Sequence, residues 1–351
     1  MADMADRADM GDIASEWRQR AQQEMDQKVK PPGSLGRLES LAVDLAVYLE
    51  TLEPRLERAR ILIFAADHGV SRLGVSAYPR EVTPQMTRTF ASGGAAITVL
   101  ARTLGLEVEV VDVGVDALLP PLPGVVDAKV RRGSRSFVDE PAMTEDELAA
   151  ALAAGRDAAS RAVGSGVDAL GLGEMGIGNT TAAAALLAAL TGLPPGDTVG
   201  RGTGVDDRGL ARKLEVVEMG LARHAAVLAD PRRALAAVGG LEIAALAGAA
   251  IEAARQRRVV LVDGFISTVA ALAAVRLAPE VRPALFFSHR SAEAGHRLAL
   301  EALAATPILD LGMRLGEGTG SCLAFPLLRA AAAILREMAT FSSAGVADQG
   351  A

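Results

Sequence analysis

The chain has 351 residues, of which 50% are hydrophobic, and its formal net charge is −7. This length is sufficient for a large core, built as one big domain or as a big domain with a small one. The negative charge and an aromatic content of only 3% do not suggest a nucleic-acid surface. The lone Cys322 excludes an internal disulfide framework and a cysteine zinc cluster. Because no apolar run has the length of a membrane span and the N-terminus does not resemble a signal peptide, we expect a cytoplasmic protein without membrane contact.

The N-terminal part of the chain has helical character. Residues 1–12 show little pattern, and we expect a disordered tail there. Residues 13–29 predict an exposed, charged helix, which two prolines and two glycines in 30–37 bring to an end. Helical spacing resumes over 38–52. Since these helices come before any strand, they favour a small separate subdomain.

Apolar runs of strand length then alternate with helical segments. The run 60–66 is apolar from Ile61 onward and is typical of a strand buried on both faces of a parallel sheet. The alternation predicts an α/β fold with a doubly wound, mostly parallel, Rossmann-like sheet. Spacing alone leaves the strand order open. The further predicted strands are 108–115, 125–131, 166–170, 258–262 and 284–287, and the predicted helices are 83–90, 94–104, 144–163, 182–190, 207–228, 241–254, 267–275, 293–304 and 322–338.

The stretch Gly171–Thr181 is rich in glycine and joins a predicted strand to an alanine-rich helix. Such a turn offers free backbone N–H groups and the positive end of a helix dipole, which together suit a phosphate. Thr180 and Thr181 can add hydroxyl donors. Glu174 would repel a phosphate, so we expect it to face a sugar or a cationic ring.

The same stretch also matches the dinucleotide-binding fingerprint through Gly171, Gly173 and Gly176. That fingerprint expects a second strand that ends in an acidic residue about 20 positions further on. Asp197 lies at a suitable distance, but a Pro-Pro turn precedes it instead of a strand. An NAD-dependent oxidoreductase is therefore the weaker alternative.

Two charged residues stand out by their sequence context. Glu317 lies between glycines, near Leu311 and Leu315, just before an apolar helix. A carboxylate in apolar surroundings has a raised pKa and can act as a general acid or base, whereas a solvated loop glutamate cannot. Lys213 follows a second glycine-rich turn, 200–207, and is either a phosphate ligand or a solvated helix lysine.

The sequence also allows a metal site to be considered. Asp67 and His68 could act as metal ligands together with His289 and His296. No close ligand spacing such as H-E-x-x-H supports this, so we favour ordinary hydrogen bonding for these side chains.

Several motifs run in order from about Lys30 to about Pro326. They are the segments 30–36, 66–70, 75–79, 82–86, 173–181, 200–204, 263–267, 288–293 and 314–320. Together these motifs resemble the nicotinate-nucleotide–dimethylbenzimidazole phosphoribosyltransferase family, and no departure from the pattern of that family appears at its core motifs.

The resemblance implies a homodimeric enzyme of cobalamin biosynthesis with no metal or redox cofactor. It implies transfer of the 5-phosphoribosyl group from nicotinate mononucleotide to 5,6-dimethylbenzimidazole, giving α-ribazole 5′-phosphate and nicotinate. It further implies a large α/β catalytic domain over 53–308. A small helical domain would combine 13–52 with 309–340, and 1–12 and 341–351 would be disordered tails.

The resemblance also implies roles for individual residues. Glu317 would take a proton from the incoming base, and Glu174 would stabilise positive charge on the ribose. A binding protein that kept the pocket but lost the chemistry should lack this base, and Glu317 is present. The expected nucleotide-binding residues are Gly176, Ile177, Gly178, Asn179, Thr180, Gly202, Lys213, Gly264 and Ser291. The expected residues of the base pocket are Tyr78, Gln85, Met175 and Leu315.

Overall fold

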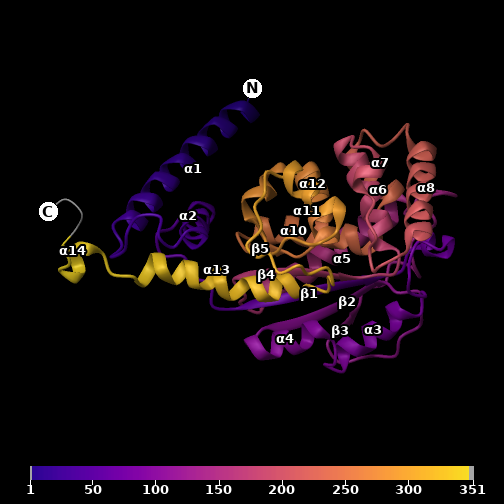
Figure 1. Cartoon of the computed structure of the whole chain (residues 1–351), viewed down its shortest axis with the longest axis horizontal. Helices are drawn as coiled ribbons and strands as arrows, with labels where there is room; N and C mark the ends of the chain where they lie inside the picture. Colours follow the sequence, from indigo (N-terminus) through magenta and orange to yellow (C-terminus); the bar gives the residue numbers. More distant parts are fainter. Residues whose placement is uncertain (1, 348–351) are drawn as a thin grey trace. The chain divides into compact units, whose positions relative to one another are not determined.

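The computed structural model describes residues 2–347, which divide into two compact units (Figure 1). The larger unit is Arg58–Ala324, and the smaller combines Met1–Glu57 with Phe325–Ala351. The smaller unit therefore resumes at Phe325 and not at residue 309 as expected. The reason is that the segment before Phe325 packs on the sheet, where buried Cys322 joins a core cluster with Ile61 and Ile63.

The larger unit contains one six-stranded sheet in the order β3-β2-β1-β4-β5-β6. Every neighbouring pair of strands is parallel, which confirms the predicted doubly wound, Rossmann-like fold. β1 is buried along nearly its whole length, as its continuous apolar run predicts. The strands are β1 (Ala59–Ala66), β2 (Glu107–Gly114), β3 (Val125–Asp127), β4 (Ala169–Met175), β5 (Val259–Val262) and β6 (Leu285–Phe287).

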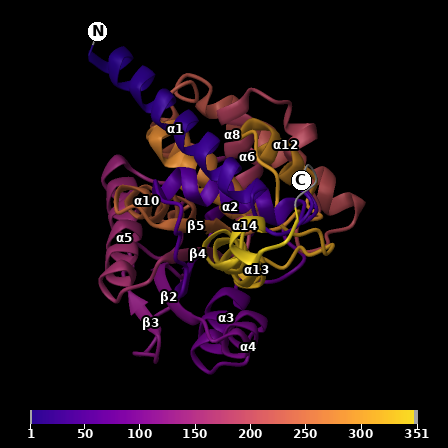
Figure 2. The same ribbon diagram turned by 90° about the vertical axis from the view of Figure 1, so that its left-hand side faces the viewer.

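Helices cover both faces of this sheet (Figures 1 and 2). One face carries α3 and α4, and the other carries α5, α10 and α11. The predicted capping box at the start of α5 is confirmed, because Thr144 and Glu147 bond each other's backbone N–H groups. The helices are η1 (Gly69–Leu73), α3 (Val82–Ala91), α4 (Ala96–Leu104), α5 (Glu145–Gly164), α6 (Asn179–Thr191), α7 (Pro195–Thr198), α8 (Asp207–His224), α9 (Pro231–Val238), α10 (Leu241–Arg255), α11 (Phe265–Leu277), η2 (Pro279–Ala284), α12 (Ala294–Ala302) and α13 (Thr319–Glu337).

Small residues allow α5 and α10 to pack backbone against backbone. A Cβ atom added at Gly155 of α5 would lie 1.9 Å from the carbonyl oxygen of Ala245 in α10. A Cβ atom added at Gly248 of α10 would lie 2.1 Å from the carbonyl oxygen of Leu152. Since a carbonyl in a helix cannot move aside cheaply, these two glycines fix the distance between the helices.

We expect Gly155→Ala to destabilise the protein by about 1–3 kcal/mol, because the added methyl group overpacks this contact. Urea denaturation of both proteins would measure the loss. Gly164→Ala at the end of the same helix is the matched control, since an added Cβ there meets nothing within 4 Å. Equal stability of the Gly155→Ala variant and the wild type would show that the helices can separate without cost.

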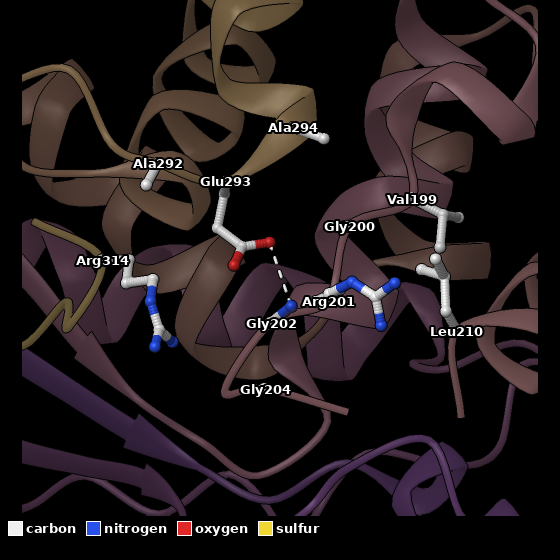
Figure 3. A pocket seen from close by; sticks show the side chains of 10 residues that line it. All are labelled: Val199, Gly200, Arg201, Gly202, Gly204, Leu210, Ala292, Glu293, Ala294 and Arg314. Atoms are coloured by element: carbon white, nitrogen blue, oxygen red, sulfur yellow. Dashed lines mark hydrogen bonds between the residues drawn. The ribbon is translucent and has the colours of Figure 1, made fainter. Parts of the chain in front are cut away.

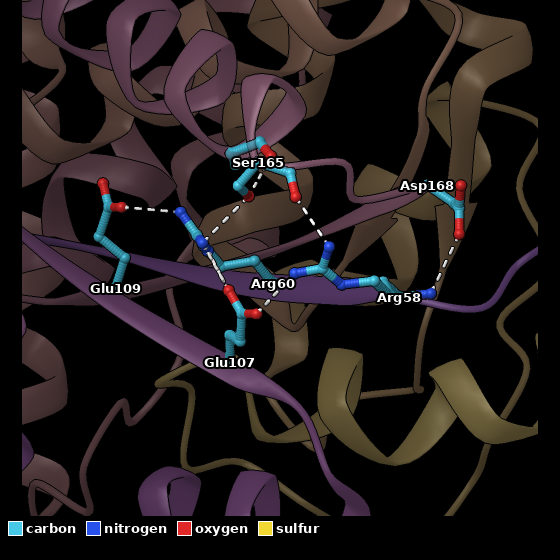
Figure 4. A network of polar contacts seen from close by, with 7 residues as sticks. Arg58, Arg60, Glu107, Glu109, Ser165 and Asp168 are labelled. Atoms are coloured by element: carbon cyan, nitrogen blue, oxygen red, sulfur yellow. Dashed lines mark hydrogen bonds and ion pairs between the residues drawn. The ribbon is translucent and has the colours of Figure 1, made fainter.

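An ion-pair network ties β1, β2 and the start of β4 together at the N-terminal ends of the strands (Figure 4). The Arg60 guanidinium donates to Glu107, with Nε 2.9 Å from Oε2, and to Glu109 at 3.2 Å. Arg58 donates its backbone N–H to Asp168 and its guanidinium to the carbonyl of Ser165. Exposed pairs of this kind each contribute about 0–1 kcal/mol, so their main effect is to hold the register at the end away from the site.

The smaller unit contains α1 (Ala2–Asp26), α2 (Arg37–Leu49), α14 (Phe341–Ala344) and the C-terminal part of α13. A buried ion pair between Lys30 and Glu39, 2.9 Å long, fixes the loop that leads into α2. The structure differs from the expected tails, because α1 begins at Ala2 and α14 lies after residue 340. Met1 and residues 348–351 lie outside the described residues. Over 2–347, no helix is both long and apolar enough to cross a membrane.

Candidate active site

The chain order of the sheet reverses between β1 and β4, where open parallel sheets place their ligand sites. The segments that follow β1, β4, β5 and β6 all contribute polar residues at this carboxyl edge. Asp67 and His68 follow β1, and Gly176 begins the turn after β4. The candidate site is built from these strand ends together with the loop that leads into α13.

The glycine-rich stretch divides differently from the prediction. β4 continues to Met175, so Gly171 and Gly173 belong to the strand, and α6 begins at Asn179. A Cβ atom at Gly171 would lie 2.3 Å from the side chain of Ile61. One at Gly173 would lie 2.6 Å from the backbone of Glu317. These two glycines therefore make room for neighbouring segments, and the match to the dinucleotide fingerprint lacks its structural context.

The loop that carries Glu317 is held in an unusual backbone conformation. Gly316, Glu317 and Gly318 have φ angles of 84°, 63° and 83°. A left-handed φ is uncommon for a residue with a side chain, and such strain gathers at functional sites. Buried Asp263, which follows β5, accepts the backbone N–H groups of Gly318 at 3.1 Å and Gly320 at 2.7 Å. The strained loop is thereby fixed on the sheet.

Glu317 and Glu174 are buried carboxyl groups in one pocket. Burial raises the pKa of Glu317 to about 7, although the backbone N–H of Ile97 opposes the rise. The Oε2 atom of Glu317 is buried and has no hydrogen-bond partner in the structure. Burial, followed by the charges of Asp263 and Glu242, raises the pKa of Glu174 to about 8. A carboxyl with a pKa near 7 and a free oxygen is suited to accept a proton from a ligand.

Glu174 lies directly beside the Glu317 loop. A Cβ atom at Gly316 would be 2.3 Å from its Oε1 atom, so only glycine fits there. Asn179, the first residue of α6, donates its side-chain N–H to the other carboxyl oxygen. The expectation that Glu174 faces a sugar or a cationic ring stays a prediction.

A cavity of about 490 Å³, with the charged side chains of Arg201, Glu293 and Arg314 in its wall, lies next to the pocket of the two carboxyl groups (Figure 3). The Oε2 atom of Glu293 accepts the backbone N–H of Gly202 at 3.1 Å. Arg201 and Arg314 lie on either side of Glu293 in this view. Gly202, Glu293 and Arg314 also line the pocket of Glu317, so the two spaces share a wall.

Lys213 of α8 is buried next to this wall. Its Nζ donates to the hydroxyl of Thr180 at 3.0 Å, and a Cβ atom at Gly202 would lie 3.0 Å from Nζ. Burial lowers its pKa to about 8, although the charge of Glu293 partly opposes this. The solvated-lysine interpretation is therefore wrong for Lys213. Its ammonium group, the hydroxyl of Thr180 and the glycine turn 200–204 make a place where an anion would be held.

An apolar cavity of about 530 Å³ shares Met175, Leu315 and Glu317 with the pocket of the two carboxyl groups. Tyr78, Met86 and Leu315 line it, and Glu317 is also at its wall. Tyr78 is 52% exposed and Leu315 is 57% exposed, which is high for such side chains. Exposed apolar side chains around a cavity are typical of a binding site for an apolar ligand.

Most of the predicted site residues meet at the small pocket of about 80 Å³ between these two cavities. Tyr78 lines the apolar cavity instead. Lys213 does not line the small pocket but donates to Thr180, which does. Gly178 is the N-cap of α6 and lines none of the three spaces. Gln85 is exposed on α3 and also lines none of them, whereas its neighbour Met86 does. The predicted residues that line the small pocket are Glu174, Met175, Gly176, Ile177, Asn179, Thr180, Gly202, Gly264, Ser291, Leu315 and Glu317.

The candidate metal ligands do not come together. His68 Nε2 pairs with buried Glu242 at 2.6 Å, and His296 Nδ1 accepts the N–H of Ser291 at 2.8 Å. Among residues 13–347, whose side chains the structure describes, no group of three or more His, Cys, Asp or Glu side chains is arranged to hold a metal ion. His289 lines the pocket of Glu317, is 1% exposed, and has no hydrogen-bond partner on either ring nitrogen. From the sequence, His289 was a possible metal ligand, and both His289 and Glu293 belong to the matching segment 288–293, but neither was named as a site residue.

The fold and the site define a class: a Rossmann-like α/β enzyme with buried Glu174 and Glu317 in a pocket at the carboxyl edge of its parallel sheet. The phosphoribosyltransferase family model matches residues 10–346, and the chain belongs to this family. A nicotinate-nucleotide–dimethylbenzimidazole phosphoribosyltransferase of Cupriavidus necator is 55% identical over 92% of this chain and 93% of its own. One of Pseudomonas aeruginosa strain PAO1 is 53% identical over 95% of each chain.

Solved structures agree with the sequence relatives. The crystal structure of CobT from Thermus thermophilus has a TM-score of 0.92 and 50% identity, and the match covers 95% of this chain and 99% of that one. These comparisons give no support to an NAD-dependent oxidoreductase. The family resemblance inferred from the motifs is confirmed.

Proposed function

We propose that this protein transfers the 5-phosphoribosyl group of nicotinate mononucleotide to 5,6-dimethylbenzimidazole. The products are nicotinate and α-ribazole 5′-phosphate, the lower-ligand nucleotide of cobalamin. The observation that carries the proposal is the buried carboxyl of Glu317, which is placed at the wall of both a polar pocket and an apolar cavity. Relatives that carry this enzyme name support it at 53–55% identity.

In the proposed reaction, one ring nitrogen of the benzimidazole attacks the ribose C1 atom. The bond from C1 to nicotinate breaks, and its electron pair makes the pyridinium a neutral pyridine. The proton on the other benzimidazole nitrogen passes to Glu317, so the product ring leaves uncharged. Attack from the face opposite nicotinate converts the β-glycosidic bond into an α bond.

The polar side of the site would hold the nucleotide. Lys213, Thr180 and the N–H groups of the two glycine turns would bind the phosphate, and this remote binding positions C1 for attack. Glu293 occupies the N–H of Gly202 in this structure, so a phosphate at that N–H must displace its carboxylate.

Glu174 would act on the positive charge of the reacting sugar. With its pKa raised to about 8, the isolated group is largely protonated at neutral pH. The pyridinium of nicotinate mononucleotide is a cation, and binding it nearby would lower the pKa of Glu174 again. The ionised carboxylate would then stabilise an oxocarbenium-like transition state.

The apolar side would hold the dimethylbenzimidazole against Tyr78, Met175 and Leu315. Gln85, expected to orient the ring, lies outside this cavity, and Met86 takes its place in the proposal. The homodimer and the cytoplasmic location that the family resemblance implies complete the proposal. Analytical ultracentrifugation of the purified protein measures the first of these.

The direct test is to mix purified protein with nicotinate mononucleotide and dimethylbenzimidazole, without metal or NAD. We expect nicotinate and α-ribazole phosphate to appear in equal amounts by chromatography. Binding of nicotinate mononucleotide without product would leave the nucleotide site in place and remove dimethylbenzimidazole as the acceptor. If there is neither binding nor product, the proposed function is wrong.

A further inference from the structure

A second, polar cavity of about 440 Å³ lies outside the site described above. Its walls are η1, the loop between η1 and α3, and the loop after β3. None of its lining residues lines the pocket of Glu317 or the two adjoining cavities. Five arginines line it: Arg72, Arg80, Arg131, Arg132 and Arg135. This concentration of positive charge contrasts with the net charge of −7 of the whole chain.

The carboxylates nearby do not saturate these guanidinium groups. The carboxylate of Asp116 alone forms ion pairs with three arginines: Arg80, Arg132 at 3.1 Å and Arg72 at 3.9 Å. A guanidinium has five N–H donors, whereas a carboxylate has about four acceptor positions. Three guanidinium groups on one carboxylate therefore leave donors in excess.

The same imbalance holds at the other end of the cavity. Glu147 receives both Arg131, at 3.5 Å, and Arg135, and it also caps α5 by accepting the N–H of Thr144. Glu140 adds one contact to Arg135 at 3.4 Å, and Asp139 is the only other acidic residue in the lining. The lining itself therefore carries five positive and two negative side chains.

Donors around the cavity also lack partners. The Nε atoms of Arg80 and Arg131 and the hydroxyl of Ser136 are buried without a hydrogen bond in the structure. Buried polar groups in folded proteins are nearly always satisfied, and an unmet donor costs about 1–3 kcal/mol. An acceptor-rich ligand in the cavity would supply the guanidinium groups with the acceptors that the nearby carboxylates lack.

We propose that this cavity is a second anion site, which binds a small molecule carrying a phosphate or diphosphate group. Arginine forks match phosphate oxygens in pairs, which explains why arginine alone supplies the positive charge in the lining. The volume lies within the range of small-ligand pockets, about 300–1,000 Å³. A concave space of this size fits a small anion and not the flat surface of a protein partner. The proposal does not depend on the proposed transferase activity.

The test is a calorimetric titration of inorganic pyrophosphate into the full-length protein at low ionic strength, with Lys213→Ala present in every protein compared so that the anion site proposed at Lys213 does not contribute. The variant is Arg72→Ala/Arg132→Ala, whose side chains are 68% and 56% exposed, so folding should be retained. The control is Arg212→Ala/Arg297→Ala, which removes two arginines of similar exposure that each pair with one carboxylate elsewhere. Both double variants lose the same net charge, so a non-specific effect of charge would affect them equally.

We expect saturable binding at this site in the Lys213→Ala parent and the control, and about tenfold weaker binding in the cavity variant, since each charged hydrogen bond adds to affinity. A parallel titration with a nucleoside monophosphate distinguishes an organic phosphate ester from an inorganic anion, according to which binds more tightly. Equal pyrophosphate affinity in the cavity variant, or an equal loss in the control, would overturn the site. If the cavity variant changes the oligomeric state while the Lys213→Ala parent binds no pyrophosphate, the cavity is an interface between copies of the chain.

Discussion

Glu317→Gln should lower kcat by about 10²–10⁴-fold, the usual contribution of a general base, while nicotinate mononucleotide binds nearly as tightly as before. Glutamine keeps the size of the side chain but cannot take the benzimidazole proton. In the wild type, kcat should fall as the pH drops below about 7, because the raised pKa leaves Glu317 protonated there. Steady-state kinetics with chromatographic detection of α-ribazole phosphate would measure both effects.

The matched control is Glu252→Gln, which changes another buried glutamate that lies on α10 and lines none of the three spaces of the site. Its turnover should equal that of the wild type. Wild-type turnover in the Glu317→Gln protein, or a pH profile that both proteins share, would remove Glu317 from the chemistry.

Stability should change in the opposite direction to activity. The folded-state pKa of Glu317 lies above its unfolded value, so the wild type loses stability as the pH rises from about 4.5 to about 7. Glutamine does not titrate, so the stability of the Glu317→Gln protein should increase relative to that of the wild type over this pH range. Thermal unfolding at pH 5 and pH 8 would compare them.

The fold was predictable because its signals are local. The apolar run that forms β1 and the capping box of α5 each lie within one short segment. The boundary between strand and turn in the glycine-rich stretch was not predictable. Gly171 and Gly173 make room for Ile61 and Glu317, which are distant in sequence. Helix α9 was missed, although Asp230 before Pro231 is a recognisable N-terminal signal and does cap it.

The candidate site was predictable in its motifs but not in its three-dimensional detail. Gly-rich turns and the Glu317 loop carry their own sequence signal, whereas the choice between Gln85 and Met86 depends on how α3 is rotated. The arginines of the second cavity come from two separate segments, Arg72 and Arg80 from one and Arg131–Arg135 from the other. The second segment is a short basic run in the sequence, and the fold brings Arg72 and Arg80 to it.

The second large expected effect is the loss of nucleotide affinity when buried Lys213 is replaced. We expect Lys213→Ala to weaken nicotinate mononucleotide binding by about 10–100-fold, the equivalent of one charge-assisted hydrogen bond to the phosphate. Binding by the wild type should itself weaken as the pH rises through about 8, where the ammonium group loses its proton. Calorimetry at pH 7 and pH 9 would measure both, and the difference between wild type and variant should shrink at the higher pH.

The control is Arg212→Ala, which removes an exposed cation from the neighbouring position of α8. Unchanged nucleotide affinity in Lys213→Ala, or an equal loss in Arg212→Ala, would remove the phosphate role. Stability again separates the two possible roles. The pKa of Lys213 is depressed, so its charged form is disfavoured in the folded protein, and Lys213→Met should raise the unfolding temperature at pH 7. If Lys213 served only the structure, its replacement would lower the stability of the protein. If Lys213 binds the ligand, its replacement should raise the stability and weaken nucleotide binding.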